Sequence, residues 1–182
     1  MVKKAVIFHG TQGSPDGNWF PWLASELLDE NYDVYVPALP TPKNQNLEEW
    51  SKIVKRLPID KDTVLIGHSC GANLLVHLLG SLNTPVKRSI IVSPFTDKIG
   101  IPDYDTLNES FFLDEKTTQM AIKNAGLIEL LYGDNDPYVP SDQPKELAKW
   151  LGVKPIIIKN GGHLNVEAGY TEFPELLKVI HG

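Results

Sequence analysis

Residues 64–71, Val64-Leu65-Ile66-Gly67-His68-Ser69-Cys70-Gly71, run from an apolar segment into a G-x-S-x-G pentapeptide. The residues that follow, 72–79, have the length and composition of a helix. A strand, a sharp turn and a helix around this pentapeptide are the context of a nucleophile elbow, which exposes the serine hydroxyl at the end of a sheet. The two glycines let strand and helix approach closely around a strained serine. We therefore predict that Ser69 is a nucleophile, rather than an incidental serine in a glycine-rich turn.

Length and charge place limits on the class of protein. A chain of 182 residues predicts one domain, residues 1–182, with one substantial core. Its formal net charge is −6, and its lysines and arginines are scattered along the chain. This pattern is not that of a protein that binds nucleic acid or an anionic membrane.

Cys70 is the single cysteine, so an intrachain disulfide is excluded. The first apolar run, residues 5–8, is too short for a signal peptide. The sequence also has no apolar stretch of the roughly 18 residues that a membrane-spanning helix needs. We expect a cytoplasmic protein.

Short apolar runs alternate with segments of helical character along the whole chain, which predicts an α/β fold with a parallel sheet and helices on both faces, a three-layer sandwich. Right-handed crossovers predict six strands in the order 2-1-3-4-5-6. The expected strands are 4–9, 32–36, 63–66, 87–92, 127–132 and 153–158. The expected helices are 19–28, 47–57, 72–79, 114–124, 141–151 and 173–180, whereas the segment 94–112 is expected to be irregular.

Ligands of such sheets bind at the carboxyl ends of the strands, where the strand order reverses. The loop 10–18 and the Ser69 turn flank that point, so a base and an acid for Ser69 are expected in neighbouring loops. His163 follows the last strand across two glycines that allow the imidazole to turn back toward Ser69. Asp136 lies in the loop after the fifth strand and is the predicted acid, with Asp134 as the competitor. The chain order serine, aspartate, histidine is that of α/β-hydrolases.

The oxyanion of an acyl-transfer intermediate needs two backbone N–H donors. We predict that Cys70, the residue after the nucleophile, and Thr11, in the loop after the first strand, supply them. The Cys70 thiol is interpreted as a small buried filler rather than a second nucleophile.

Aromatic residues in or beside the loops at this end of the sheet predict a modest apolar substrate pocket. Only about twenty residues separate the fourth strand from the next helix, too few for a large lid domain. The candidates are Trp19, Trp22, Phe95 and Tyr138, together with Phe20, Tyr104, Phe111 and Phe112.

Several motifs resemble those of the compact serine hydrolases of the retinoblastoma-binding-protein-nine and YdeN type. They are Phe8-His9-Gly10, the Ser69 pentapeptide, the loop 133–139 and Gly162-His163-Leu164-Asn165. The resemblance covers essentially the whole chain. It implies a reduced α/β-hydrolase fold without the first two antiparallel strands, and a catalytic triad of Ser69, Asp136 and His163.

These features predict a serine hydrolase, of carboxylesterase type, that cleaves a small-molecule ester or related acyl substrate through an acyl-enzyme. The sequence has no zinc, dinucleotide or P-loop motif, so we expect no metal and no organic cofactor. Two alternatives stay open. One is a protein-interaction module with a secondary or vestigial hydrolase site, whose protein partner the sequence does not identify. The other is a peptidase or amidase that uses the same triad.

Overall fold

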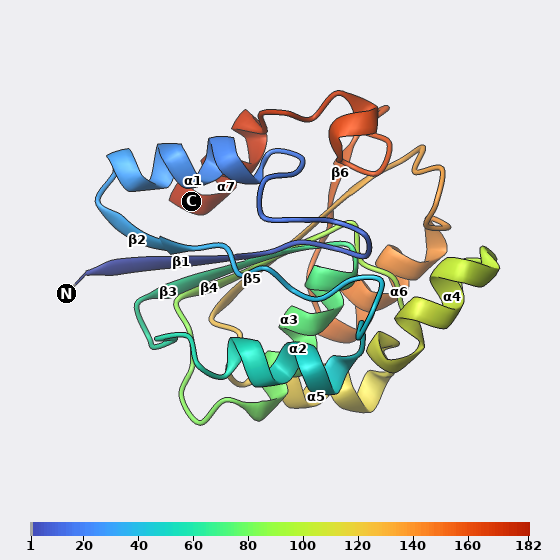
Figure 1. The fold of residues 1–182 in the computed structure, drawn as a ribbon, viewed down its shortest axis with the longest axis horizontal. Helices are drawn as coiled ribbons and strands as arrows, with labels where there is room; N and C mark the ends of the chain where they lie inside the picture. The colour runs from blue at the N-terminus through green and yellow to red at the C-terminus, as the bar shows by residue number, and fades with distance from the viewer. Residues whose placement is uncertain (1) are drawn as a thin grey trace.

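The computed structural model describes residues 2–182, and its six strands form one parallel sheet in the order β2-β1-β3-β4-β5-β6 (Figure 1). Apolar strands buried on both faces favour parallel pairing under helices, and the predicted fold and strand order are confirmed. The strands are β1 (Lys3–Phe8), β2 (Tyr32–Tyr35), β3 (Thr63–His68), β4 (Arg88–Val92), β5 (Leu127–Gly133) and β6 (Ile156–Ile158).

Helices cover both faces of this sheet. The helices α1 and α7 lie on one face, and α2, α3, α5 and α6 lie on the other (Figure 1). Their bounds are α1 (Phe20–Asp29), α2 (Leu47–Val54), α3 (Cys70–Ser81), α4 (Pro102–Asn108), α5 (Glu115–Ile122), α6 (Asp142–Leu151) and α7 (Pro174–His181). Two short 3₁₀ helices, η1 (Glu109–Phe111) and η2 (Val166–Ala168), complete the set within residues 2–182.

Each face of the sheet has its own hydrophobic core, because successive side chains of a strand point to opposite faces. In β1, Ala5 and Ile7 pack under α1 and α7, whereas Val6 and Phe8 pack against α3 on the other face. All six residues of β3 are buried, and β3 pairs with β1 and β4. The Ser69 turn therefore follows a fully buried strand in the interior of the sheet.

The segment 94–112 is not irregular, as the sequence had suggested, because it contains α4 and η1. Pro102 stands at the start of α4, where its missing N–H costs no hydrogen bond. The Asp105 carboxylate accepts hydrogen bonds from the backbone N–H groups of Ile99 and Gly100, at 2.7 and 3.2 Å, and so ties the preceding loop to the helix. This prediction was wrong because a proline at a helix start was interpreted as a helix breaker.

The last strand is shorter than the predicted segment 153–158. The Val153 N–H donates to the Ala148 carbonyl in the C-terminal cap of α6, and Gly152 is left-handed there, with φ 70°. Residues 153–155 therefore complete the cap of α6 and connect it to β6. Pairing with β5 begins at Ile156.

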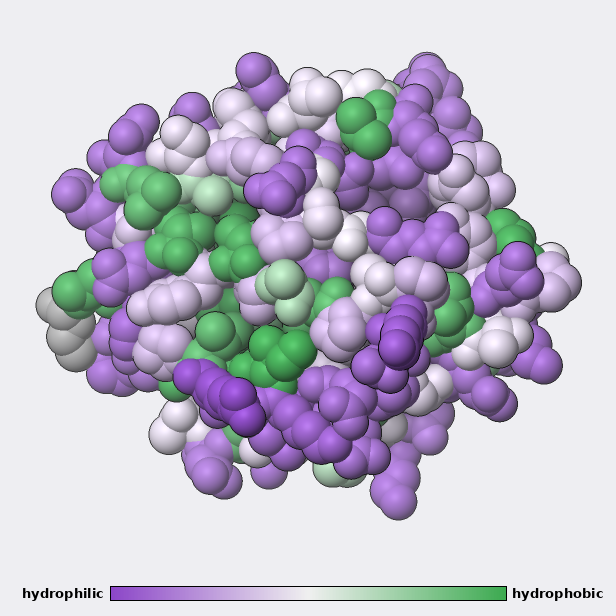
Figure 2. Space-filling view, viewed as in Figure 1, coloured by the Kyte–Doolittle hydropathy of each residue, from purple (hydrophilic) through white to green (hydrophobic). Residues whose placement is uncertain are grey.

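Figure 2 shows hydrophilic side chains over much of one face, with hydrophobic ones gathered on the side where the edge strand β2 runs. Among residues 2–182, none of the helices combines the length and the apolar character needed to cross a membrane.

Candidate active site

Ser69 occupies the tight turn between β3 and α3. Its backbone angles, φ 54° and ψ −124°, are strained for a residue with a side chain, as in a nucleophile elbow. The neighbouring glycines make the turn feasible. A Cβ atom on Gly67 would lie 2.4 Å from the Gly71 carbonyl oxygen, and one on Gly71 would lie 2.4 Å from the Phe8 carbonyl oxygen.

The loop after β1 lies directly against this turn. A Cβ atom on Gly10 would stand 2.9 Å from the Ser69 Cβ, so only glycine permits the contact. The next residue is Thr11, and the backbone N–H groups of Thr11 and Cys70 donate no hydrogen bond to any group within residues 2–182. The two predicted oxyanion donors are thus free and flank Ser69 from two different loops.

His163 and Asp136 form a hydrogen-bonded pair. The His163 Nδ1 lies 2.7 Å from the Asp136 Oδ2, and the side chains are only 9% and 3% exposed. The other carboxylate oxygen, Oδ1, accepts from the N–H groups of Tyr138 and Val139 at 2.9 and 3.0 Å, which holds the carboxylate in place beside His163. Since Nδ1 is taken up by Asp136, Nε2 is the ring nitrogen that His163 has left for the cavity that it shares with Ser69.

Asp134, the competitor for the acid role, contacts the backbone of the loop that carries His163, here called the histidine loop, rather than the His163 ring. Its Oδ1 accepts from the Asn160 N–H at 2.7 Å, and the Asn135 Oδ1 accepts from the Gly162 N–H at 2.8 Å. A Cβ on Gly133 would lie 2.2 Å from the Gly162 carbonyl oxygen. The two loops are therefore fastened together, and this holds His163 beside Asp136.

His68 lies in the pentapeptide, and its side chain contacts the loop that carries His163. Its Nε2–H donates to the His163 carbonyl at 2.8 Å, and the two rings are 4.9 Å apart. The Ser93 hydroxyl donates to the same carbonyl at 3.2 Å. Burial lowers the pKa of His68 to about 3, so its imidazole is neutral near pH 7. No local pattern signals this contact, because the partners lie 95 residues apart.

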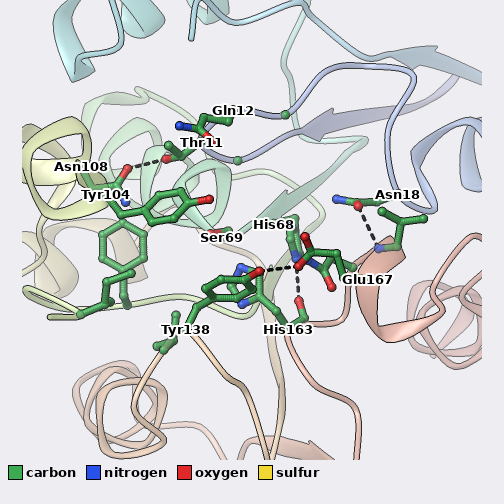
Figure 3. Close-up of a pocket in the computed structure, with 17 residues that line it drawn as sticks. Thr11, Gln12, Asn18, His68, Ser69, Tyr104, Asn108, Tyr138, His163 and Glu167 are labelled. Carbon is green, nitrogen blue, oxygen red and sulfur yellow. Dashed lines mark hydrogen bonds between the residues drawn. The ribbon is translucent and has the colours of Figure 1, made fainter. Parts of the chain in front are cut away.

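Ser69 and His163 line one cavity of about 260 Å³ (Figure 3). Three of the pocket candidates, Phe95, Tyr104 and Tyr138, also line it. Thr11, the predicted oxyanion donor, lines it too. Polar side chains that the sequence had not singled out complete much of the wall, so the cavity is more polar than the predicted apolar pocket. They are Gln12, Asn18, Asn108, Asn165 and Glu167.

Trp19 and Trp22 do not line the cavity, which corrects the prediction for both. Trp19 is fully buried, its Nε1–H donates to the Leu164 carbonyl at 2.9 Å, and its ring packs edge-on against Phe20 and Phe173. Trp22 packs against the same core, under α1 and α7. Trp19, at the N-cap of α1, extends the hydrophobic stripe that buries the helix, whereas Trp22 is only partly buried. The further candidates Phe20, Phe111 and Phe112 are also not part of the cavity wall.

Within residues 2–182, no three His, Cys, Asp or Glu side chains gather in a way that could hold a metal ion. The Cys70 thiol is buried, and burial raises its pKa, so it is a protonated filler beside the turn.

A parallel sheet of this order, with a strained serine after its central strand, defines an α/β-hydrolase. Comparison with known proteins identifies the family: the model of the serine hydrolase family matches residues 5–181, and the chain belongs to that family.

Two relatives share the whole domain. The putative hydrolase YdeN of Bacillus subtilis (strain 168) is 27% identical over 184 residues, covering 99% of this chain and 95% of YdeN. The crystal structure of the B. subtilis ydeN product matches with a TM-score of 0.88 and 26% identity, over 98% of this chain and 97% of that chain. The serine hydrolase RBBP9 of Rattus norvegicus is 25% identical over 181 residues, covering 97% of this chain and 93% of RBBP9.

A more distant structure shares the fold alone. Est1E from Butyrivibrio proteoclasticus, solved with ferulic acid bound, has a TM-score of 0.71 and 14% identity, over 99% of this chain and 90% of that chain.

Proposed function

We propose that the protein is a carboxylesterase-like serine hydrolase that cleaves small esters through Ser69, His163 and Asp136. The observation that carries the proposal is the buried hydrogen bond between His163 and Asp136, on the wall of the cavity that also contains the strained Ser69. An acid that orients a neutral imidazole beside a serine is the arrangement that makes a hydroxyl nucleophilic.

The reaction follows from these positions. Ser69 Oγ attacks the acyl carbon while His163 Nε2 takes the hydroxyl proton, and the Asp136 carboxylate stabilises the imidazolium that forms. The Thr11 and Cys70 N–H groups donate to the oxyanion. The imidazolium then gives its proton to the leaving alcohol, which leaves an acyl group on Ser69. A water molecule deprotonated by His163 attacks this ester and releases the acid and the free serine.

Two relatives support a hydrolase with this kind of substrate. RBBP9 is named a serine hydrolase, and the distant Est1E holds ferulic acid, an aromatic carboxylic acid. The cavity volume of about 260 Å³ suits a small acyl compound rather than a polymer.

A fluorophosphonate probe tests the nucleophile. We expect the probe to label the wild type at Ser69 and to leave Ser69→Ala unlabelled, with kcat for p-nitrophenyl butyrate reduced about 10⁴-fold or more. Ser81→Ala is the matched control, because Ser81 ends the same helix, far from the Ser69 turn, and its hydroxyl donates to the Leu78 carbonyl. Equal labelling of the wild type and Ser69→Ala would overturn the proposal and favour an interaction module.

A substrate panel tests the reaction class. We expect turnover of p-nitrophenyl esters to exceed turnover of aminoacyl p-nitroanilides. Substantial turnover of the anilides alone would replace ester hydrolysis by peptidase or amidase activity on the same three residues.

A further inference from the structure

A chain of hydrogen bonds separate from the Ser69, His163 and Asp136 group runs from the loop after β1 to α4. The backbone N–H of Gln12 donates to Thr41 Oγ1 at 2.7 Å, and the Thr41 hydroxyl donates onward to Gln45 Oε1 at 2.6 Å. At the far side, Gln45 Nε2 donates to the Leu107 carbonyl at 3.2 Å. A backbone carbonyl only accepts, so the contact with Leu107 directs the Gln45 NH₂ group to this side and leaves Oε1 to accept from Thr41.

The orientation of Asn108 follows from that of Gln45. Gln45 Nε2 donates to Asn108 Oδ1 at 2.9 Å and to Thr11 Oγ1 at 2.8 Å. The Thr11 hydroxyl in turn donates to the same Asn108 oxygen (Figure 3). Two donors thus converge on Asn108 Oδ1, and a flip of this amide would place its NH₂ group against the Gln45 NH₂ group, a donor-donor contact. The Asn108 NH₂ group therefore points away from the network.

This NH₂ group opens on the cavity. Asn108 is 4% exposed and lines the cavity, and its Nδ2 has no hydrogen-bond partner within residues 2–182. In that part of the chain, the Tyr132 hydroxyl is the one side-chain polar atom that is both enclosed by protein and unpaired. The Asn108 nitrogen is therefore accessible from the cavity. A ligand that fills the cavity there must offer this N–H group an acceptor, since it displaces the water that the group would otherwise bind.

The position of Asn108 shows which part of a substrate it can meet. Figure 3 shows Thr11 and Asn108 on one side of Ser69, and His163 and Glu167 on the other. His163 must reach the leaving oxygen to protonate it, so the alcohol lies on the side of His163. The acyl chain then extends toward Thr11 and Asn108, with its carbonyl oxygen at the Thr11 N–H.

We infer that Asn108 is a substrate-recognition residue, and that the site prefers acyl groups with an ether, hydroxyl or carbonyl oxygen close to the scissile carbonyl over plain alkyl groups of equal length. The inference rests on the proposed ester hydrolysis and specifies its substrate class. A donor held in place before binding favours an acceptor strongly, because an alkyl chain would leave the NH₂ group desolvated and unpaired.

The test compares p-nitrophenyl methoxyacetate with p-nitrophenyl butyrate, whose acyl groups have the same number of heavy atoms. In the wild type, the ratio of their kcat/KM values should exceed the ratio of their alkaline hydrolysis rates by about tenfold, the effect of one hydrogen bond. Dividing by the alkaline hydrolysis rates corrects for the different intrinsic reactivities of the two esters, and the test needs no variant. Equal ratios would overturn the inference.

Variants locate the preference at Asn108. Asn108→Asp keeps the oxygen that Gln45 and Thr11 need and loses the donor, and Asn108→Leu loses both. Each should reduce the preference for methoxyacetate about tenfold relative to the wild type. Asn46→Asp is the matched control: it makes the same chemical change at the cap of α2, where the side chain accepts from the Glu49 N–H, and its preference should equal that of the wild type.

The outcomes separate this inference from the proposed function. If folded Asn108→Asp and Asn108→Leu hydrolyse both esters with the same preference for methoxyacetate as the wild type, the proposed substrate class is overturned and the proposed function stands. A wild type that hydrolyses neither ester and resists the fluorophosphonate overturns the proposed function and the inference together.

Discussion

His68 links the Ser69 turn to the backbone of the histidine loop through a neutral imidazole. Its Nε2–H donates to the His163 carbonyl, and its environment is fully buried. Burial is the largest cause of its low pKa, and the neighbouring His163 and His9 lower it further, whereas Asp136 opposes them. Protonation would place a positive charge in this buried site, so acid should weaken the fold at this point.

We predict that His68→Gln makes the protein less sensitive to acid. The pKa of His68 is about 3 in the folded protein and about 6.5 in an unfolded chain. Between these values the unfolded state binds a proton that the folded state does not. The free energy of unfolding therefore falls as the pH falls, by up to about 1.4 kcal/mol for each pH unit from this group. Glutamine keeps an N–H donor but cannot take up a proton in this range.

Urea unfolding at pH 7, 6, 5 and 4.5 measures the effect. The slope of unfolding free energy against pH should be smaller in His68→Gln by close to one proton. Equal slopes in both proteins would show that the acid sensitivity originates elsewhere.

The close approach of α3 to β1 depends on the glycine that follows Cys70. We predict that Gly71→Ala destabilises the protein by about 3 kcal/mol or more, because the new methyl group would lie 2.4 Å from the Phe8 carbonyl oxygen. Gly80→Ala, in the same helix, should instead raise the free energy of unfolding by about 0.5–1 kcal/mol. There the nearest atom is Met120 Cβ, at the ordinary contact distance of 3.6 Å.

Chemical denaturation of both variants checks this pair. Similar stabilities of the two variants would show that the turn relaxes around a methyl group at Gly71, and that this glycine is not needed for close packing.

The arrangement of elements could be predicted from the sequence because each strand is an apolar run and crossovers have one hand. The loops that carry Asp136 and His163 follow strand ends, so topology alone brings them to the same edge. In contrast, α4 was not predicted, since Pro102 marks a helix start as readily as a break. Without α4, Asn108 could not be placed at the site, and its contact with Gln45 spans 63 residues with no local pattern.

The sequence also could not predict whether an aromatic side chain near the site points into the cavity or into the core. Trp19 borders the loop after β1, and an aromatic ring in that position can face either the cavity or the core. The structure places it in the core, where its N–H reaches the Leu164 carbonyl. By contrast, Tyr138 lies in the same loop as Asp136, and its ring lies against the His163 ring on the cavity wall.

The charge of the molecule and the charge of the cavity have the same sign. The chain carries a formal net charge of −6, and no lysine or arginine lines the cavity within residues 2–182. Glu167 stands on the cavity wall on the leaving-group side (Figure 3). The Tyr138 hydroxyl and, more weakly, the Asn165 amide donate to its carboxylate and hold its pKa below the usual range, so it stays ionised. The site should therefore repel an anionic leaving group.

We predict that 3-carboxy-4-nitrophenyl butyrate, which carries a negative charge on its leaving group, is a salt-dependent substrate. Between 10 and 500 mM salt, its kcat/KM should rise about fivefold as repulsion is screened, while that of p-nitrophenyl butyrate should stay constant. Glu167→Gln should raise kcat/KM for the anionic ester at low salt and reduce its salt dependence. Glu172→Gln removes the same charge at an exposed position outside the cavity wall and separates local repulsion from the field of the whole protein. Equal gains in the two variants would assign the repulsion to net charge, whereas a gain in Glu167→Gln alone would assign it to the cavity.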